Sequence, residues 1–309
     1  MRFRALATLP LLASLACAGG APTRMGSPRE PAQPRVGELW SVAAGRSIAW
    51  PELERRARAA RFVLLGEVHD NPVHHRLEAR VIAALATSPR PPAVVFEMLD
   101  RAQQSEVDAF LAEGRRDPDA FAARVGWAES GWPEFALYRP VFAAVLEGGL
   151  PILAAGLPRG TMGRDEPPAG WRERFGLAEP LPPAEQAHRL EEMFESHCEL
   201  IPREQLGPMV TMQRARDARM ADALLRGAEA RGQAVLVAGS GHARRPDVPE
   251  LLERAGTARS ATLSIGFLEV DPEPRRLEDP EVQGFDVAVF TATAEREDPC
   301  ERLRRRLAP

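Results

Sequence analysis

The chain has 309 residues, enough for one large domain or two small ones, and its apolar fraction of 44% is ordinary for a globular protein. All 40 basic residues are Arg, which reflects a codon bias, and the net charge of −4 gives no reason to expect nucleic acid as a partner. The same bias leaves one Asn, Asn71, and one Tyr, Tyr138, so both residues attract attention.

The N-terminal segment predicts export and a membrane tether. Two arginines precede an apolar run at residues 5–15 that is too short to span a bilayer, so residues 1–16 are predicted to be a signal peptide. The run ends in a segment that resembles a lipobox, in which Cys17 is acylated, although Ser14 replaces the usual Leu. Residues 17–40 then form a flexible linker, and we expect a lipid-anchored protein on the periplasmic side of the cell envelope, at the outer membrane. The same segment also fits cleavage and simple secretion.

Strand and helix signals alternate through residues 41–292. Short apolar runs followed by turns predict strands at 62–65, 93–96, 151–155, 235–238, 262–268 and 287–290. The alternation predicts an α/β fold with a mostly parallel central sheet and flanking helices, in which the first four strands are neighbours.

The intervening segments predict the helices. They are expected at 72–85, 102–111 and 249–254, and as a long helical insertion at 184–230 that is broken near Pro202 and Pro208. Residues 293–309 are predicted to be a charged, mobile tail. Cys198 and Cys300 lie far apart in the sequence, so a disulfide between them is left open.

Two Gly-x-x-His turns carry the chemistry of this sequence. Gly66-Glu67-Val68-His69 follows the first predicted strand and Gly239-Ser240-Gly241-His242 follows the fourth, while Glu97 ends the second. Ligands of open α/β sheets bind at the carboxyl ends of the strands, so these groups are expected to converge. Glu67, His69, Glu97 and His242 could then bind Zn²⁺, Mn²⁺ or Fe, or perform acid–base catalysis. Each could also be an ordinary hydrogen-bonded loop residue.

A His pair lies in the helix after the first turn. Asn71 before Pro72 is predicted to cap this helix. His74 shares the helix face that carries apolar residues, whereas His75 lies about 100° around the helix and could pair with Glu78.

Six sequence blocks in order resemble the ChaN-like haem-binding uptake family of the Tiki superfamily. They cover roughly residues 60–270 and are Leu65–Pro72 with His74-His75, Phe96-Glu97-Met98 with Gln104, Trp132 with Tyr138-Arg139-Pro140, Ala154–Arg159, Gln213 with Arg216–Ala221, and Ala238–His242.

The resemblance implies an exported haem-binding lipoprotein for haem or iron acquisition. Tyr138, His74 or His75 would then face the haem, with Arg139 or Arg159 meeting its propionates. A homodimer is left open.

The superfamily also includes the Tiki metalloproteases and the erythromycin esterases, which implies an alternative function as a metal-dependent hydrolase. By that resemblance Glu67, His69, Glu97 and His242 would carry catalysis. Gly156 departs from the family pattern, which usually has Asn before Leu-Pro-Arg, and any mechanism that needs the amide is put in doubt.

Overall fold

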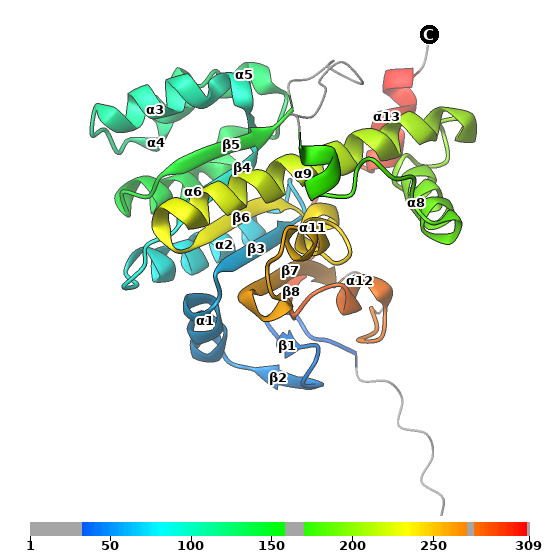
Figure 1. Cartoon of the computed structure of the whole chain (residues 1–309), viewed down its shortest axis with the longest axis horizontal. Helices are drawn as coiled ribbons and strands as arrows, with labels where there is room; N and C mark the ends of the chain where they lie inside the picture. The colour runs from blue at the N-terminus through cyan, green and yellow to red at the C-terminus, as the bar shows by residue number, and fades with distance from the viewer. Residues whose placement is uncertain (1–32, 158–169, 271–274, 308–309) are drawn as a thin grey trace, which may run out of the picture. The chain divides into compact units, whose positions relative to one another are not determined.

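An eight-stranded sheet forms the centre of the computed structural model, which describes residues 33–157, 170–270 and 275–307 (Figure 1). The sheet order is β2-β1-β8-β7-β3-β6-β4-β5, and all pairings from β8 to β5 are parallel, whereas β1 is antiparallel to β2 and β8. The strands are β1 (Leu39–Ser41), β2 (Arg46–Ile48), β3 (Phe62–Glu67), β4 (Ala93–Asp100), β5 (Ile152–Gly156), β6 (Ala234–Gly239), β7 (Thr262–Val270) and β8 (Val287–Ala292). The predicted fold class is confirmed.

Helices connect the strands. They are α1 (Trp50–Ala59), α2 (Pro72–Ala86), α3 (Gln104–Ala112), α4 (Pro118–Arg124), α5 (Trp127–Ser130), α6 (Phe135–Glu147), α7 (Trp171–Arg174), α8 (Pro183–Ser196), α9 (Leu206–Arg231), α10 (Ser240–Ala243), α11 (Val248–Arg254), α12 (Pro280–Gln283) and α13 (Pro299–Leu307). Short 3₁₀ turns cover Arg101–Gln103, Arg203–Gln205 and Arg259–Ala261. None of these described helices has the length and apolar character that a bilayer crossing requires.

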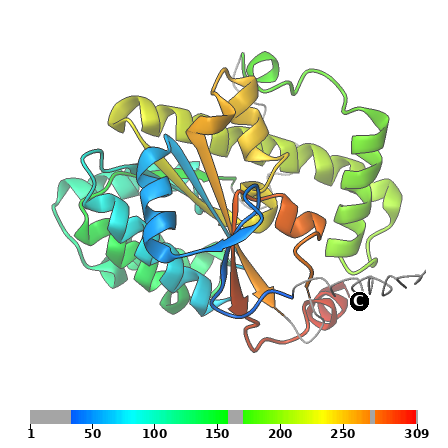
Figure 2. The ribbon, with the colours of Figure 1, turned by 90° about the horizontal axis from the view of Figure 1, so that it is seen from below.

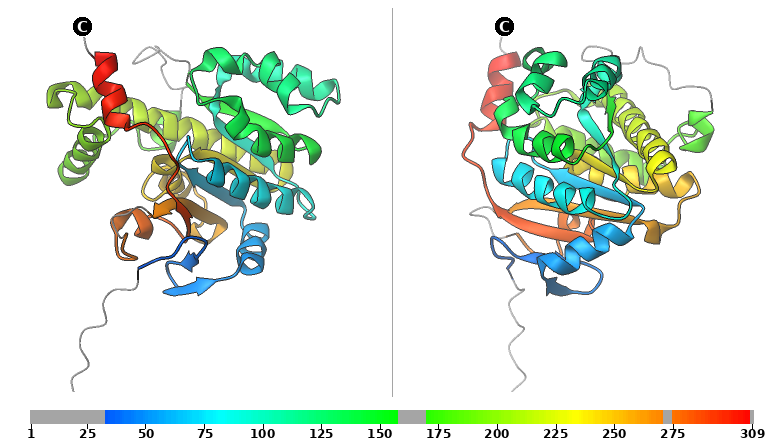
Figure 3. Two further views of the ribbon diagram at one scale, coloured as in Figure 1. Left: turned by 180° about the vertical axis from the view of Figure 1, so that it is seen from behind. Right: turned by 90° about the vertical axis from the view of Figure 1, so that its left-hand side faces the viewer.

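Helices cover both faces of the sheet (Figures 2 and 3). Successive side chains of a strand point to opposite faces, so Val63 and Leu65 of β3 pack with α1, α2 and α6 in one core. Phe62 and Leu64 point the other way and pack with α9 and α11 in a second core. Because both faces are buried, the central strands are continuous apolar runs.

The four strands that were predicted to be neighbours are adjacent, in the order β3-β6-β4-β5. Their register pairs Glu67 of β3 with Gly239 of β6, and Phe96 of β4 with Val237 of β6. Parallel strands end at the same edge, so this register brings together the two Gly-x-x-His turns and Glu97. Glu97 was predicted to end its strand, but β4 continues to Asp100, and Glu97 follows the last residue of β4 that pairs with β6. The long insertion is also observed, as α8 and α9, although Pro208 lies within α9 instead of breaking it.

The C-terminal segment differs from the prediction of a mobile tail. Residues Pro299–Leu307 form α13, and a disulfide joins Cys300 to Cys198 at the end of the α8 segment. The many charged residues of this segment suggested a solvated tail. The disulfide was not predictable from them, because its two cysteines lie 102 positions apart in the sequence. The predicted signal peptide and Cys17 lie outside the described residues.

Candidate functional site

Four predicted residues, Glu67, His69, Glu97 and His242, meet at the carboxyl edge of the sheet and are named the edge cluster. Glu97 lies between the two histidines: its Oε2 is 3.7 Å from His69 Nε2 and its Oε1 is 3.3 Å from His242 Nε2. Glu67 Oε1 lies 2.9 Å from His69 Nδ1. The predicted convergence of the two turns is therefore confirmed.

Glu97 is the centre of the edge cluster. The backbone N–H of Gly239 donates to its Oε2 at 2.9 Å, and the Arg216 guanidinium donates to its Oε1. Burial raises the pKa of Glu97, but the nearby positive charge of His242, with His69 and Arg216, outweighs burial and holds this pKa well below its usual range. Glu97 is thus a buried carboxylate whose charge is balanced by its neighbours.

His242 is held by two carboxylates. Its Nδ1 donates to Asp217 Oδ1 at 2.5 Å, and its Nε2 faces Glu97. Burial lowers the pKa of His242, but Glu97 and Asp217 outweigh it and raise this pKa to about 10. Glu97 and Asp217 therefore favour the imidazolium form of His242, in which both ring nitrogens carry a proton.

His69 is the accessible histidine of the edge cluster. Its side chain is 31% exposed, against 6% for His242. Its ring packs on Trp132 with 4.8 Å between ring centroids, and its Nδ1 also lies 3.0 Å from the Tyr138 hydroxyl. Burial opposes a positive charge on His69, yet Glu67 and Glu97 outweigh that effect and raise its pKa.

Three of the residues predicted to bind haem lie in the interior. Tyr138, His74 and His75 are 0% exposed. The Tyr138 hydroxyl donates to Glu67 Oε1 at 2.7 Å, and burial raises the pKa of Tyr138 well above its ordinary value. A tyrosinate facing a ligand at the surface is therefore not what the structure shows, because α6 presents Tyr138 to the core.

His74 has a structural role that differs from the predicted one. The backbone N–H of Val68 donates to His74 Nδ1 at 2.9 Å, and His74 Nε2 donates to the Thr291 hydroxyl at 2.8 Å. Burial lowers the pKa of His74 to about 3, so the ring is neutral. His74 ties the first Gly-x-x-His turn to β8.

Arg139, one of the two predicted propionate partners, pairs with α4 and not with the edge cluster. Arg139 donates to Asp119 of α4, with contacts of 2.8 and 3.0 Å. Arg159 lies outside the described residues. Arg216 is the cation that the structure places at Glu97 instead.

A surface cavity of about 190 Å³ lies beside the edge cluster. Glu97, Met98 and Trp132 line it, together with Glu129 and Leu157. Its wall therefore combines an indole and a thioether with carboxylates, a mixture that suits a ligand with an apolar body and polar groups.

Gly156, which stands where the family usually has Asn, lies against the end of β4. A Cβ at this position would come within 2.3 Å of the Glu97 carbonyl oxygen and 3.0 Å of the Leu99 carbonyl oxygen. The register of β4 and β5 shifts between Phe96 and Asp100, which brings the two backbones together. In this arrangement no side chain fits at residue 156 without moving the strand that carries Glu97.

Two residues of the site, Arg216 and Asp217, were missed as site residues although they belong to one of the family blocks. With Gln213, whose amide nitrogen is 3.1 Å from His242 Nδ1, they are spaced i, i+3 and i+4 along α9. That spacing places them on one helix face. A polar face on a helix that covers a sheet was the available signal.

The fold and the edge cluster define an α/β protein with a cluster of polar side chains at the carboxyl edge of a mostly parallel sheet. A family model described as haem-binding uptake, Tiki superfamily, ChaN matches residues 53–249. The chain belongs to this family, and membership supports a haem-binding role.

One solved structure agrees with the fold. A structure of cofacial heme binding to ChaN of Campylobacter jejuni has a TM-score of 0.62 at 19% identity and covers 81% of this chain and 95% of that chain. The type III effector HopBA1 has a TM-score of 0.47 at 14% identity, covering 86% of this chain and 98% of its own. None of the curated proteins compared with the chain matches it.

Proposed function

We propose that the protein is an exported, lipid-anchored haem-binding protein that serves haem or iron acquisition. One observation carries the haem part: in a chain of the haem-binding uptake family, His69 presents a partly exposed imidazole packed on Trp132, which itself lines the neighbouring cavity. An imidazole can bind haem iron, and an indole face suits a porphyrin.

Among the candidate haem ligands, His69 is accessible to haem iron, whereas Tyr138, His74 and His75 are buried. The contact from His69 Nε2 to Glu97 Oε2 is 3.7 Å, too long for a hydrogen bond, so little is lost if this nitrogen turns to a ligand. The cavity of about 190 Å³ is smaller than sites that enclose a whole ligand of this size, so part of the porphyrin would lie on the open surface.

A hemin absorption titration tests the proposal. We expect saturable binding by the wild-type protein and binding that is weaker by more than about tenfold in His69→Ala, which corresponds to about 1.4 kcal/mol. His188→Ala is the matched control, because the His188 side chain is 68% exposed on α8 and outside the edge cluster. Equal affinity in His69→Ala and the wild type would refute the assignment. Light scattering of the same samples shows whether the chain forms a homodimer.

A hydrolase is the second candidate, and one observation favours it. Two imidazoles, His69 and His242, are each held by a carboxylate on either side of Glu97, the arrangement that orients a general base or acid. The variants His69→Ala and His188→Ala also test this candidate. Hydrolysis of a nitrophenyl ester should be lost in His69→Ala and kept in His188→Ala. An assay repeated with a chelator reports whether a metal takes part.

The membrane anchor is proposed from the lipobox-like sequence before Cys17. Since one acylated Cys would carry the lipid, Cys17→Ser should move the full-length protein from the membrane fraction to the soluble periplasmic fraction. Immunoblots of fractionated cells measure the distribution. A Cys17→Ser protein that stays with the membranes would rule out this anchor.

A further inference from the structure

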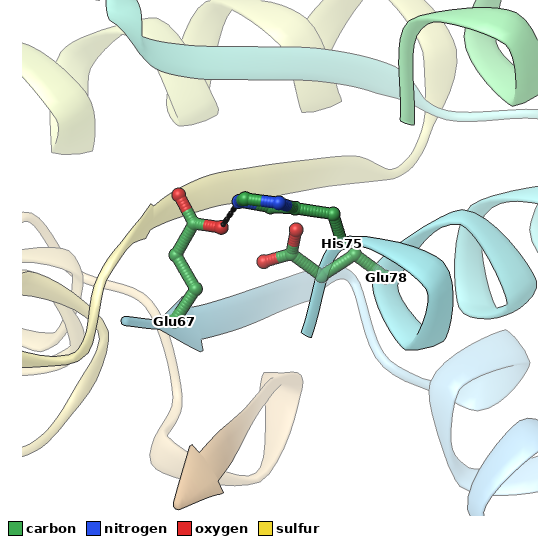
Figure 4. Close-up of side chains that lie close together, drawn as sticks. All are labelled: Glu67, His75 and Glu78. Atoms are coloured by element: carbon green, nitrogen blue, oxygen red, sulfur yellow. Dashed lines mark ion pairs between the residues drawn. The ribbon is translucent and has the colours of Figure 1, made fainter. Parts of the chain in front are cut away.

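A second cluster lies behind the edge cluster and shares one residue with it. Glu67 at the end of β3 faces His75 and Glu78 of α2, and these three residues are named the buried triad (Figure 4). Potential ligand atoms of the three side chains all lie within 4.8 Å of one another. Among the described residues this is the one group of three or more His, Cys, Asp or Glu side chains with such spacing.

The helix geometry explains why two of the three side chains point to one place. His75 and Glu78 are spaced i, i+3, so they project from the same face of α2, toward the carboxyl end of β3. Carboxylate and imidazole groups at this spacing hold the metal ions of helical di-metal proteins.

The buried triad contains polar atoms without hydrogen-bond partners. Both carboxylate oxygens of Glu78, which is 0% exposed, are buried and unpartnered, and so is Glu67 Oε2. His75 Nε2 lies 2.6 Å from Glu67 Oε2, but neither atom has a partner with hydrogen-bond geometry. Buried polar atoms without partners are costly, so this arrangement calls for a ligand that all three side chains can bind.

We propose that a divalent transition-metal ion binds to the buried triad through Glu67 Oε2, His75 and Glu78. Two carboxylates balance the charge of a divalent cation, and the imidazole favours Zn²⁺, Co²⁺, Mn²⁺ or Fe²⁺ over Mg²⁺. Three protein ligands leave a coordination position for water. This set differs from the predicted one, in which His69 and His242 were metal ligands.

Glu67 links this ion to the edge cluster. Its Oε1 contacts His69 Nδ1 and accepts from the Tyr138 hydroxyl, while its Oε2 faces the triad. The first oxygen therefore has the hydrogen-bonded partners that orient a metal-binding carboxylate, and the second is available to the ion. A metal at the triad would fix the side chain that positions His69.

Cobalt binding tests the proposal on the folded full-length protein. After treatment with a chelator, the protein is equilibrated with Co²⁺ alone and followed by visible absorption and by elemental analysis of the metal content. We expect one equivalent of bound Co²⁺ with ligand-field bands, and affinity lower by more than about 100-fold in Glu78→Gln, since losing even an outer-shell partner costs 10- to 100-fold.

Glu78→Gln keeps the shape of the side chain and removes a charge, so it should fold, which circular dichroism checks. Glu192→Gln is the matched control, because Glu192 lies on α8 outside the buried triad, where it pairs with Arg244 at 2.7 Å, and its replacement should leave Co²⁺ binding unchanged. His75→Gln is the second variant, for the case that Glu78→Gln does not fold.

Two results would overturn the proposal: no stoichiometric Co²⁺ in the wild type, or unchanged affinity in the triad variants. Because hemin is absent from this experiment, its outcome is independent of the haem proposal.

Discussion

The free energy of unfolding should fall by a few kcal/mol as the pH rises from about 6.5 to about 10, at about 1.4 kcal/mol per unit of pKa difference. Glu97 and Asp217 raise the pKa of His242 from its ordinary 6.5 to about 10 in the folded protein. A raised pKa means that the folded state holds the proton more tightly than the unfolded state. The stabilisation is therefore fully present below the unfolded value and is lost as the pH rises through the folded value.

Urea unfolding followed by circular dichroism at several pH values measures this loss. His242→Gln is the control variant, because it cannot carry the charge. It should be less stable than the wild type near pH 6.5 and show a flatter dependence between about pH 6.5 and 10. Equal losses of stability in both proteins over this range would show that His242 does not supply the effect.

Replacing Glu97 with Leu should destabilise the fold by about 3–5 kcal/mol, the usual effect of removing one partner from a buried ion pair. The change leaves His242 and Arg216 without the carboxylate that they share, and it leaves the Gly239 N–H without its acceptor. Urea denaturation at neutral pH measures the difference, provided that the variant folds at the start of the titration.

Glu129→Leu is the matched control for this experiment. Glu129 lines the same surface cavity as Glu97 but is exposed, so its replacement should change stability by no more than about 0.5 kcal/mol. Equal effects of the two substitutions would mean that Glu97 is not the centre of a buried charge network.

The sequence allowed prediction of the part of the fold that positions the site. Each central strand is a short apolar run, and a turn and a helix follow it, so β3, β4, β5 and β6 could be recognised and placed together. Parallel pairing then required that Glu67, Glu97 and the second turn share an edge. Strands β1 and β2 were not predicted, because three residues each carry too little periodicity.

The surroundings of each side chain were not predictable in the same way. His75, Glu78 and Tyr138 lie on faces of α2 and α6 that the neighbouring layers bury, and a polar residue on such a face looks from sequence like a solvent-facing one. The ionised state of His242 depends on Asp217, which comes from α9, 25 residues away in the chain. Such distant partners follow from packing, and the available sequence signal for Asp217 was the polar helix face that it shares with Gln213 and Arg216.

The bond between Cys198 and Cys300 makes a closed covalent ring of the part of the chain that includes α9, β6, β7 and β8. The ring therefore contains Asp217 and His242, while Glu67, His69 and Glu97 lie on the open part that precedes it. If the backbone were cut once between Cys198 and Cys300, the disulfide would still join the two fragments of the chain until it is reduced. Because disulfides persist in oxidising compartments, this covalent ring would stay closed in an exported protein, the state proposed above.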